Sequence, residues 1–177
     1  MNYGQIYYAD VANGNGCRTS LFVSGCTHHC EGCFNEMTWD FSYGHPYTKE
    51  TEDKIIESLK PSYIAGLTIL GGEPMEQKNQ KEVHALIMRM RKEVCHGTVW
   101  IFSGYTWEEL IDPDNKRCRS AYTDEILRNI DILVDGEFVQ EKKNIALKFR
   151  GSENQRVIDV PRTLSAGQVV LSPYSDN

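Results

Sequence analysis

The sequence predicts an α/β protein whose parallel strands form an open partial (β/α) barrel or a wound sheet. Short apolar runs alternate with stretches of helical spacing, which is typical of parallel strands joined by right-handed crossovers. Only four such strands are recognisable, too few for a closed eight-stranded barrel. Each strand ends in a polar or glycine-rich turn. Because ligands of such sheets bind beyond the carboxyl ends of the strands, we expect the chemistry at that edge.

The individual elements follow from these patterns. The predicted strands cover residues 19–24, 67–70, 98–102 and 131–134. The predicted helices cover residues 51–60, 79–94, 106–111 and 123–129. The longest of these helices is amphipathic, with its apolar side chains on one face. The segment after about residue 150 is less patterned, and residues 168–171 are a candidate edge strand.

Size and composition favour one soluble domain over residues 1–177, with 40% hydrophobic and 25% charged residues. No apolar run reaches the ~18 residues that span a bilayer, and the N-terminus lacks the pattern of a secretory signal. We therefore expect a cytoplasmic protein that does not bind membranes. The formal net charge is −6, and the basic clusters are short, which argues against nucleic-acid binding.

Three of the six cysteines, Cys26, Cys30 and Cys33, lie within eight residues. Their spacing would place them on one face of a helix, so a buried core is one interpretation. Gly25 and Gly32 are weak helix formers, and the segment begins where a strand should end. These features favour a metal-binding loop.

The metal is inferred from the number of ligands. Structural zinc takes four protein ligands, and His28 or His29 could complete such a set, although the ligands would be crowded in one short loop. An iron–sulfur cluster suits three cysteine thiolates and leaves one iron open. We expect the two histidines to be loop residues near the cluster. The remaining cysteines are expected to be buried or spectator thiols: Cys17, Cys95 and Cys118.

Two motifs together resemble the signature of the radical S-adenosylmethionine superfamily. The first is the spacing Cys26-x3-Cys30-x2-Cys33 followed by Phe34, and the second is the turn Gly71-Gly72-Glu73-Pro74 after the second predicted strand. Further segments resemble the anaerobic ribonucleotide reductase activating proteins, among them residues 13–16, 21–26, 103–106, 133–138 and 150–156. Phe34 and Glu73 stand where tyrosine and aspartate are frequent in that family, and both keep the chemical type.

The resemblance implies a partial barrel of the radical S-adenosylmethionine type and a set of site residues. Cys26, Cys30 and Cys33 would be the catalytic ligands of a [4Fe-4S] cluster whose fourth iron binds S-adenosylmethionine. The residues implied in cofactor binding are Gly32, Cys33, Phe34, Gly71, Gly72 and Glu73. Glycines allow a close backbone approach, and a carboxylate accepts a charge-assisted bond from the methionyl ammonium. Ser103, Asp135 and Glu137 either meet the cofactor or cap strand ends.

The implied function is activation of the anaerobic ribonucleotide reductase by generation of a glycyl radical on its large subunit. A flavodoxin or a ferredoxin is the implied electron donor. Alternatives within the class are an activase of another glycyl-radical enzyme, such as pyruvate formate-lyase, and a radical enzyme acting on a small molecule. A non-catalytic zinc or electron-transfer module is the alternative from another class, and metal analysis would distinguish it.

Overall fold

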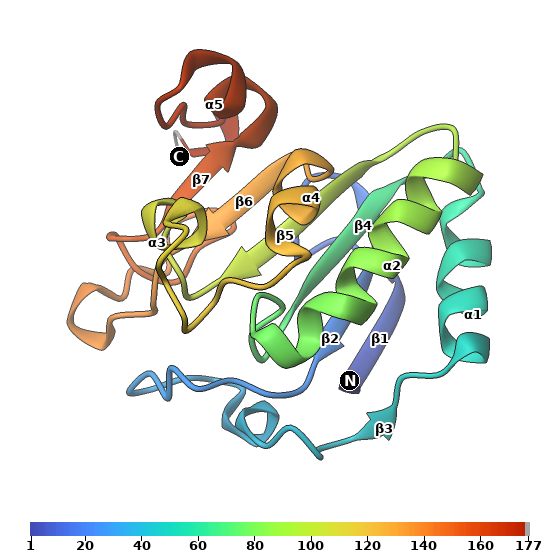
Figure 1. The fold of residues 1–177 in the computed structure, drawn as a ribbon, viewed down its shortest axis with the longest axis horizontal. Helices are drawn as coiled ribbons and strands as arrows, with labels where there is room; N and C mark the ends of the chain where they lie inside the picture. The colour runs from blue at the N-terminus through green and yellow to red at the C-terminus, as the bar shows by residue number, and fades with distance from the viewer. Residues whose placement is uncertain (176–177) are drawn as a thin grey trace.

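The fold is built on one open seven-stranded sheet. The computed structural model describes residues 1–175, with the strand order β3-β1-β2-β4-β5-β6-β7. The four predicted strands are confirmed, and they lie side by side and parallel in the centre (Figure 1). Their bounds are β2 (Cys17–Val23), β4 (Ile64–Gly71), β5 (Thr98–Ser103) and β6 (Ile132–Asp135).

The expectation of parallel strands is wrong at both edges of the sheet. Strand β1 (Asn2–Asp10) pairs antiparallel with β2 and carries the two-residue strand β3 (His45–Pro46). Strand β7 (Arg156–Asp159) pairs antiparallel with β6. The edge strand predicted at residues 168–171 is also wrong, because that segment runs beside β7 and makes only an isolated bridge from Leu171 to Ile158.

The four predicted helices are confirmed to within two residues at each end. They are α1 (Lys49–Leu59), α2 (Gln77–Glu93), α3 (Trp107–Ile111) and α4 (Thr123–Arg128). Thr106 begins α3 with a capping box shared with Glu109. The sequence did not predict α5 (Val160–Ala166) or the short 3-10 helices η1 (Glu36–Trp39), η2 (Gln140–Lys142) and η3 (Pro173–Ser175).

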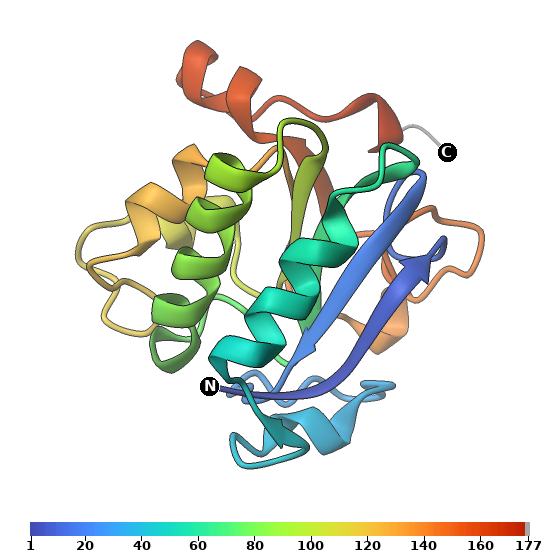
Figure 2. The ribbon, with the colours of Figure 1, turned by 90° about the vertical axis from the view of Figure 1, so that its right-hand side faces the viewer.

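The two faces of the sheet differ in what covers them. Helices α1, α2 and α4 lie on one face (Figures 1 and 2), where their apolar side chains pack on Ile69, Ile101 and Leu133. Neighbouring positions along a strand point to opposite faces. Phe102 and Val134 therefore belong to a second apolar cluster on the other face. That second face, together with the carboxyl ends of the parallel strands, forms the candidate site.

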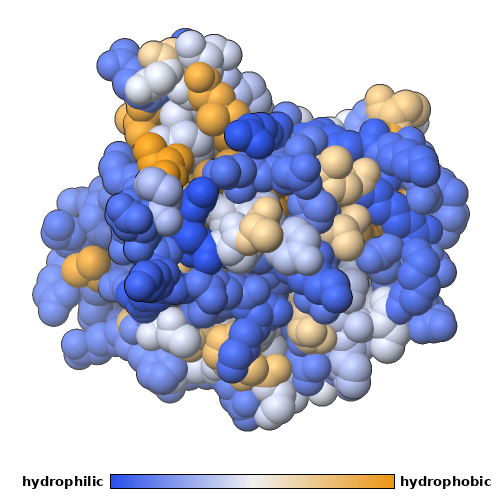
Figure 3. Space-filling model, in the orientation of Figure 1, coloured by the Kyte–Doolittle hydropathy of each residue, from blue (hydrophilic) through white to orange (hydrophobic). Residues whose placement is uncertain are grey.

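The helix-covered face of the molecule is mostly hydrophilic, with an apolar area over α5 (Figure 3). Within residues 1–175, no helix combines the length and the apolar character needed to cross a membrane.

Candidate active site

The three motif cysteines lie on a loop that leaves β2 at the carboxyl end of the parallel strands. The loop continues the pairing of β2 with β4 beyond the sheet, since Gly72 N donates to Val23 O at 2.7 Å and Glu73 N donates to Gly25 O at 2.8 Å. On its other side, Gly25 N donates to Thr38 O at 2.7 Å. The loop is therefore held between the turn after β4 and the segment around η1, and it is not a helix.

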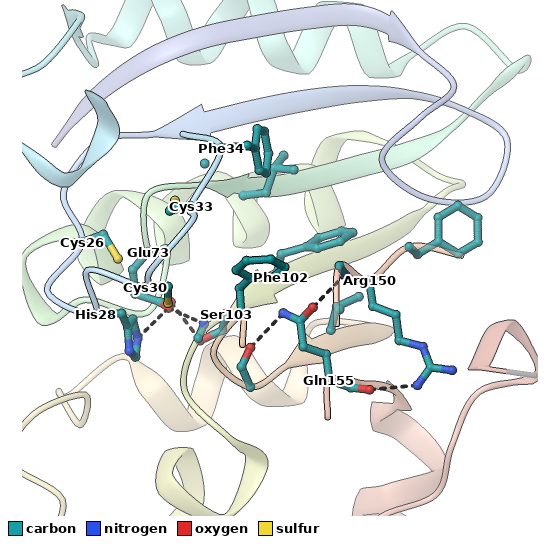
Figure 4. A pocket seen from close by; sticks show the side chains of 18 of the residues that line it. Cys26, His28, Cys30, Cys33, Phe34, Glu73, Phe102, Ser103, Arg150 and Gln155 are labelled. Carbon is teal, nitrogen blue, oxygen red and sulfur yellow. Dashed lines mark hydrogen bonds and ion pairs between the residues drawn. The ribbon is translucent and has the colours of Figure 1, made fainter. Parts of the chain in front are cut away.

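All three cysteines line one cavity of about 560 Å³. Figure 4 shows them at one end of this cavity, with Arg150 and Gln155 at the other. Cys26 is buried, Cys30 and Cys33 are half-buried, and all three are free thiols. Burial raises the pKa of Cys26 to about 12 and also raises the pKa of Cys30. A metal must displace these protons on binding.

The donor set fits an iron–sulfur cluster, because three free thiols of one loop face a shared cavity and thiolates are the usual cluster ligands. Within residues 1–175, no three Cys, His, Asp or Glu side chains meet around one point as ligands of a single metal ion. Neither histidine is placed as a fourth ligand. His29 stacks on Trp39 with ring centroids 4.5 Å apart, and His28 lies between two carboxylates.

Glu73 lines the cavity, but its carboxylate already holds the surrounding turns together. It is 1% exposed and accepts hydrogen bonds from Met75 N at 2.7 Å, Ser103 Oγ at 2.9 Å and Gly104 N at 2.6 Å. The turn after β4 is thereby joined to the turn after β5. Ser103 also accepts a bond from Tyr105 N at 3.1 Å, so it caps the end of β5 while it faces the cavity.

The three predicted glycines line the cavity, and contacts and backbone angles within the chain explain why these positions are glycine. A Cβ on Gly72 would come within 2.7 Å of Gly25 O and 2.9 Å of Thr38 O, so the cysteine loop leaves no room for one. Gly71 has a φ of +107°, and Gly32 has a φ of +71°. Both values favour glycine over other residues. Phe34 lines the mouth of the cavity and is 91% exposed.

Two of the residues expected either to meet the cofactor or to cap strand ends, Asp135 and Glu137, do not line this cavity. Asp135 is 1% exposed and accepts bonds from Arg156 Nε at 3.0 Å and Trp107 N at 2.7 Å. Arg156 also pairs with Glu108 at 2.7 Å. Asp135 therefore ties β6 to β7 and to the start of α3, which is the strand-end role that the sequence left as an alternative.

His28 lies on the loop beside the cysteines, as expected, and its side chain is 3% exposed and lines the cavity, but sequence reasoning missed its partners. Its Nδ1 lies 2.5 Å from Glu137 Oε1, and its buried Nε2 lies 3.2 Å from Glu73 Oε2 without the alignment of a hydrogen bond. Burial by itself would lower the pKa of His28, but Glu73 and Glu137 outweigh it and raise that pKa.

Sequence reasoning also missed Glu76, a buried residue at the N-cap position of α2. Its carboxylate accepts bonds from Thr27 N at 2.8 Å and Thr27 Oγ1 at 2.6 Å, directly after Cys26.

The far wall of the cavity comes from residues 143–155. Arg150 donates to Gln155 O and to Ser175 O, both at 2.9 Å. Gln155 accepts from Gly151 N at 2.8 Å. These contacts order the C-terminal segment. Ile145 lies on the same wall and is 93% exposed.

Comparison with known proteins agrees with this geometry. Residues 12–158 match the family model described as a 4Fe-4S single cluster domain. The chain is 46% identical over 157 residues to a protein of Vibrio cholerae, covering 88% of this chain and 96% of that protein. It is 40% identical to a protein of Escherichia coli K12 over 89% of this chain and 97% of the relative. A protein of bacteriophage T4 is 37% identical over 89% of this chain and 93% of its own length. All three relatives are named anaerobic ribonucleoside-triphosphate reductase-activating protein, and this chain belongs to that family.

Proposed function

We propose that this protein activates an anaerobic ribonucleotide reductase by generating a glycyl radical on its large subunit, through reductive cleavage of S-adenosylmethionine at a [4Fe-4S] cluster. The observation that carries this proposal is that three free cysteines of one loop line a single cavity in a chain of this family. The open sheet with its parallel centre supports a partial barrel of the radical S-adenosylmethionine type.

Cys26, Cys30 and Cys33 would hold the cluster as thiolates. When bound and reduced, the cluster would supply one electron for the cleavage of S-adenosylmethionine to methionine and a 5′-deoxyadenosyl radical, which would take a hydrogen atom from a glycine of the reductase. The protein's own contribution is to orient the cofactor and to exclude competing reactions.

Several residues around the cavity suit these tasks. Gly32, Gly71 and Gly72 line the cavity, and Phe34 supplies an aromatic face at its mouth. The Glu73 carboxylate offers negative charge for the methionyl ammonium, in addition to the bonds that it makes within the chain. Ser103 faces the same space. Asp135 does not line the cavity, and its bonds to Arg156 and Trp107 stabilise the fold beside it.

The partner of the reaction is a protein, and the exposed apolar side chains Phe34 and Ile145 at the cavity mouth suit contact with a polypeptide. We propose a flavodoxin or ferredoxin-type electron donor on the family resemblance alone. We also propose a cytoplasmic location, which the sequence pattern led us to expect. The same resemblance suggests likeness to the activating enzyme of pyruvate formate-lyase (formate C-acetyltransferase).

The test is an anaerobic reconstitution with iron, sulfide and a reductant. We expect about four irons per chain, release of 5′-deoxyadenosine from S-adenosylmethionine, and an electron paramagnetic resonance doublet after mixing with the reductase. Cys30→Ser should lose both cluster and cleavage. Cys95→Ser, an exposed thiol outside the cavity, is the matched control and should keep both.

A cluster-loaded protein that releases no 5′-deoxyadenosine would disprove the reaction. A doublet that forms with pyruvate formate-lyase and not with the reductase would identify the alternative activase, and one zinc per chain in place of iron would identify a zinc module.

A further inference from the structure

We infer that His28 is a positioning residue that fixes the cysteine loop to the ends of β4, β5 and β6. The inference rests on the proposed function, because it assigns a role in placing the thiols that would hold the cluster. His28 lies between Cys26 and Cys30, so its anchoring constrains two of the three thiols at once.

The first anchor joins the loop to two strand ends through the imidazole nitrogens. Nδ1 lies 2.5 Å from Glu137 Oε1 after β6, and Nε2 lies 3.2 Å from Glu73 Oε2 after β4. Glu73 cannot swing away easily, since Met75 N, Ser103 Oγ and Gly104 N hold its carboxylate in place. The contact to Glu73 is therefore rigid, whereas the contact to Glu137 reaches a half-exposed side chain.

The second anchor is packing against the turn after β5. The imidazole lies edge-on to the Tyr105 ring, with centroids 4.4 Å apart. A Cβ on Gly104 would approach the His28 ring to 2.7 Å, so this glycine makes the space that the ring occupies. Because the His28 side chain is also only 3% exposed, these contacts fix the position of its ring in the cavity wall.

A third contact comes from outside the cavity. The Arg117 guanidinium lies over the Tyr105 ring at 5.1 Å from the centroid, and its Nη2 lies 3.3 Å from His28 Nδ1, which cannot accept from it while it donates to Glu137. Arg117 Nη1 is also 3.9 Å from Glu137 Oε1. His28 follows β2, and it thus contacts residues at the ends of the other three parallel strands, β4, β5 and β6.

The chain offers a matched control for this arrangement. His84 on α2 also pairs with a glutamate, at 2.5 Å from Glu125 Oε2, and lies against a tyrosine, at 5.2 Å from the Tyr122 ring. It does not line the cavity. His28→Phe and His84→Phe therefore remove the same kind of ion pair and keep the same kind of aromatic contact.

The experiment measures three properties of the reconstituted protein: the rate of iron release to a chelator, the change in the electron paramagnetic resonance signal when S-adenosylmethionine is added, and the melting temperature. For His28→Phe we expect iron release to be roughly tenfold faster and the cofactor-induced change to weaken. His84→Phe should match the wild type in both. Glu137→Gln, which weakens only the half-exposed partner, should shift both readouts in the same direction by roughly twofold to threefold.

Wild-type iron release and a wild-type spectral change in both His28→Phe and Glu137→Gln would overturn the inference. Equal losses in His28→Phe and His84→Phe would also overturn it, because they would report only general stability. If His28→Phe does not fold, Glu137→Gln decides alone. Failure of the proposed function is separate, since it would show in the wild type as a missing cluster or missing cleavage.

Discussion

Glu73 stands two residues after β4 and Asp135 is the last residue of β6, and the structure uses their carboxylates differently. Both are buried and both accept several hydrogen bonds. Glu73 also faces the cavity of the cysteines, whereas Asp135 is absent from its lining. A buried carboxylate that accepts protein hydrogen bonds on both oxygens stabilises the turns that supply the donors. The difference between the two residues is therefore a matter of access to the cavity.

We predict that Asp135→Asn weakens the fold and spares cofactor binding. The amide removes the charge that Arg156 and Trp107 N face, and it turns an N–H₂ group toward donors. The free energy of unfolding should fall by about 2–3 kcal/mol, measured by urea denaturation. The Michaelis constant for S-adenosylmethionine should change by less than about twofold. Unchanged stability with a much higher Michaelis constant would instead place Asp135 on the cofactor.

At the scale of elements, the site depends on two turns that continue the sheet past its last residues. The turn after β4 and the cysteine loop pair through backbone bonds, just as β4 and β2 pair within the sheet. Glu76, at the start of α2, then holds Thr27 at the beginning of the loop. The cysteine loop is irregular in secondary structure, but its backbone is tied to regular elements, which suits a site that must be preorganised.

We predict that Gly72→Ala disturbs this pairing. The new methyl group would meet Gly25 O and Thr38 O, which are backbone atoms that cannot rotate aside. Iron content after reconstitution should fall, and the free energy of unfolding should decrease by about 2 kcal/mol.

Gly167→Ala is the control for this prediction. Gly167 ends α5 with a φ of +68° and has no atom within 4 Å of an added Cβ. This substitution should cost about 1 kcal/mol and leave the iron content unchanged. Equal iron content in the two variants would contradict the packing explanation.

At the scale of the whole molecule, the core and the site occupy opposite faces of one sheet. The larger apolar cluster joins the sheet to α1, α2 and α4, and the cavity opens on the other face. Ion pairs between the elements add an electrostatic component. Among them, Arg156 links α3 to the end of β6 through Glu108 and Asp135.

This electrostatic component predicts a response to acid. Hydrogen bonds from Arg156 outweigh partial burial and hold the pKa of Glu108 below its usual value of 4.5, and Arg119 similarly lowers the pKa of Asp124. A carboxyl whose pKa is lower in the folded state stabilises the fold above its unfolded pKa, and this stabilisation disappears as the pH falls through the folded pKa.

The free energy of unfolding of the apoprotein should therefore decrease as the pH falls below about 4.5, measured by denaturant titration at a series of pH values. Glu108→Gln should decrease less steeply over this range, because it lacks one of these carboxyls. A slope equal to that of the wild type would show that the pair does not contribute.

The sequence by itself determined the parallel centre of the sheet, helices α1 to α4 and the place of the cysteine loop. These features rest on apolar periodicity and on residues a few positions apart, which act through local geometry. Tertiary structure alone decided the edge strands and the roles of two side chains. Strand β1 has mostly exposed or half-buried residues, so its pattern is weak, and β7 pairs with β6 across about twenty residues of sequence. Asp135 is directly opposite Arg156 in that pairing, and His28 meets Glu73 and Glu137 only where three strand ends converge. Such contacts join residues far apart in the chain, and no local pattern specifies them.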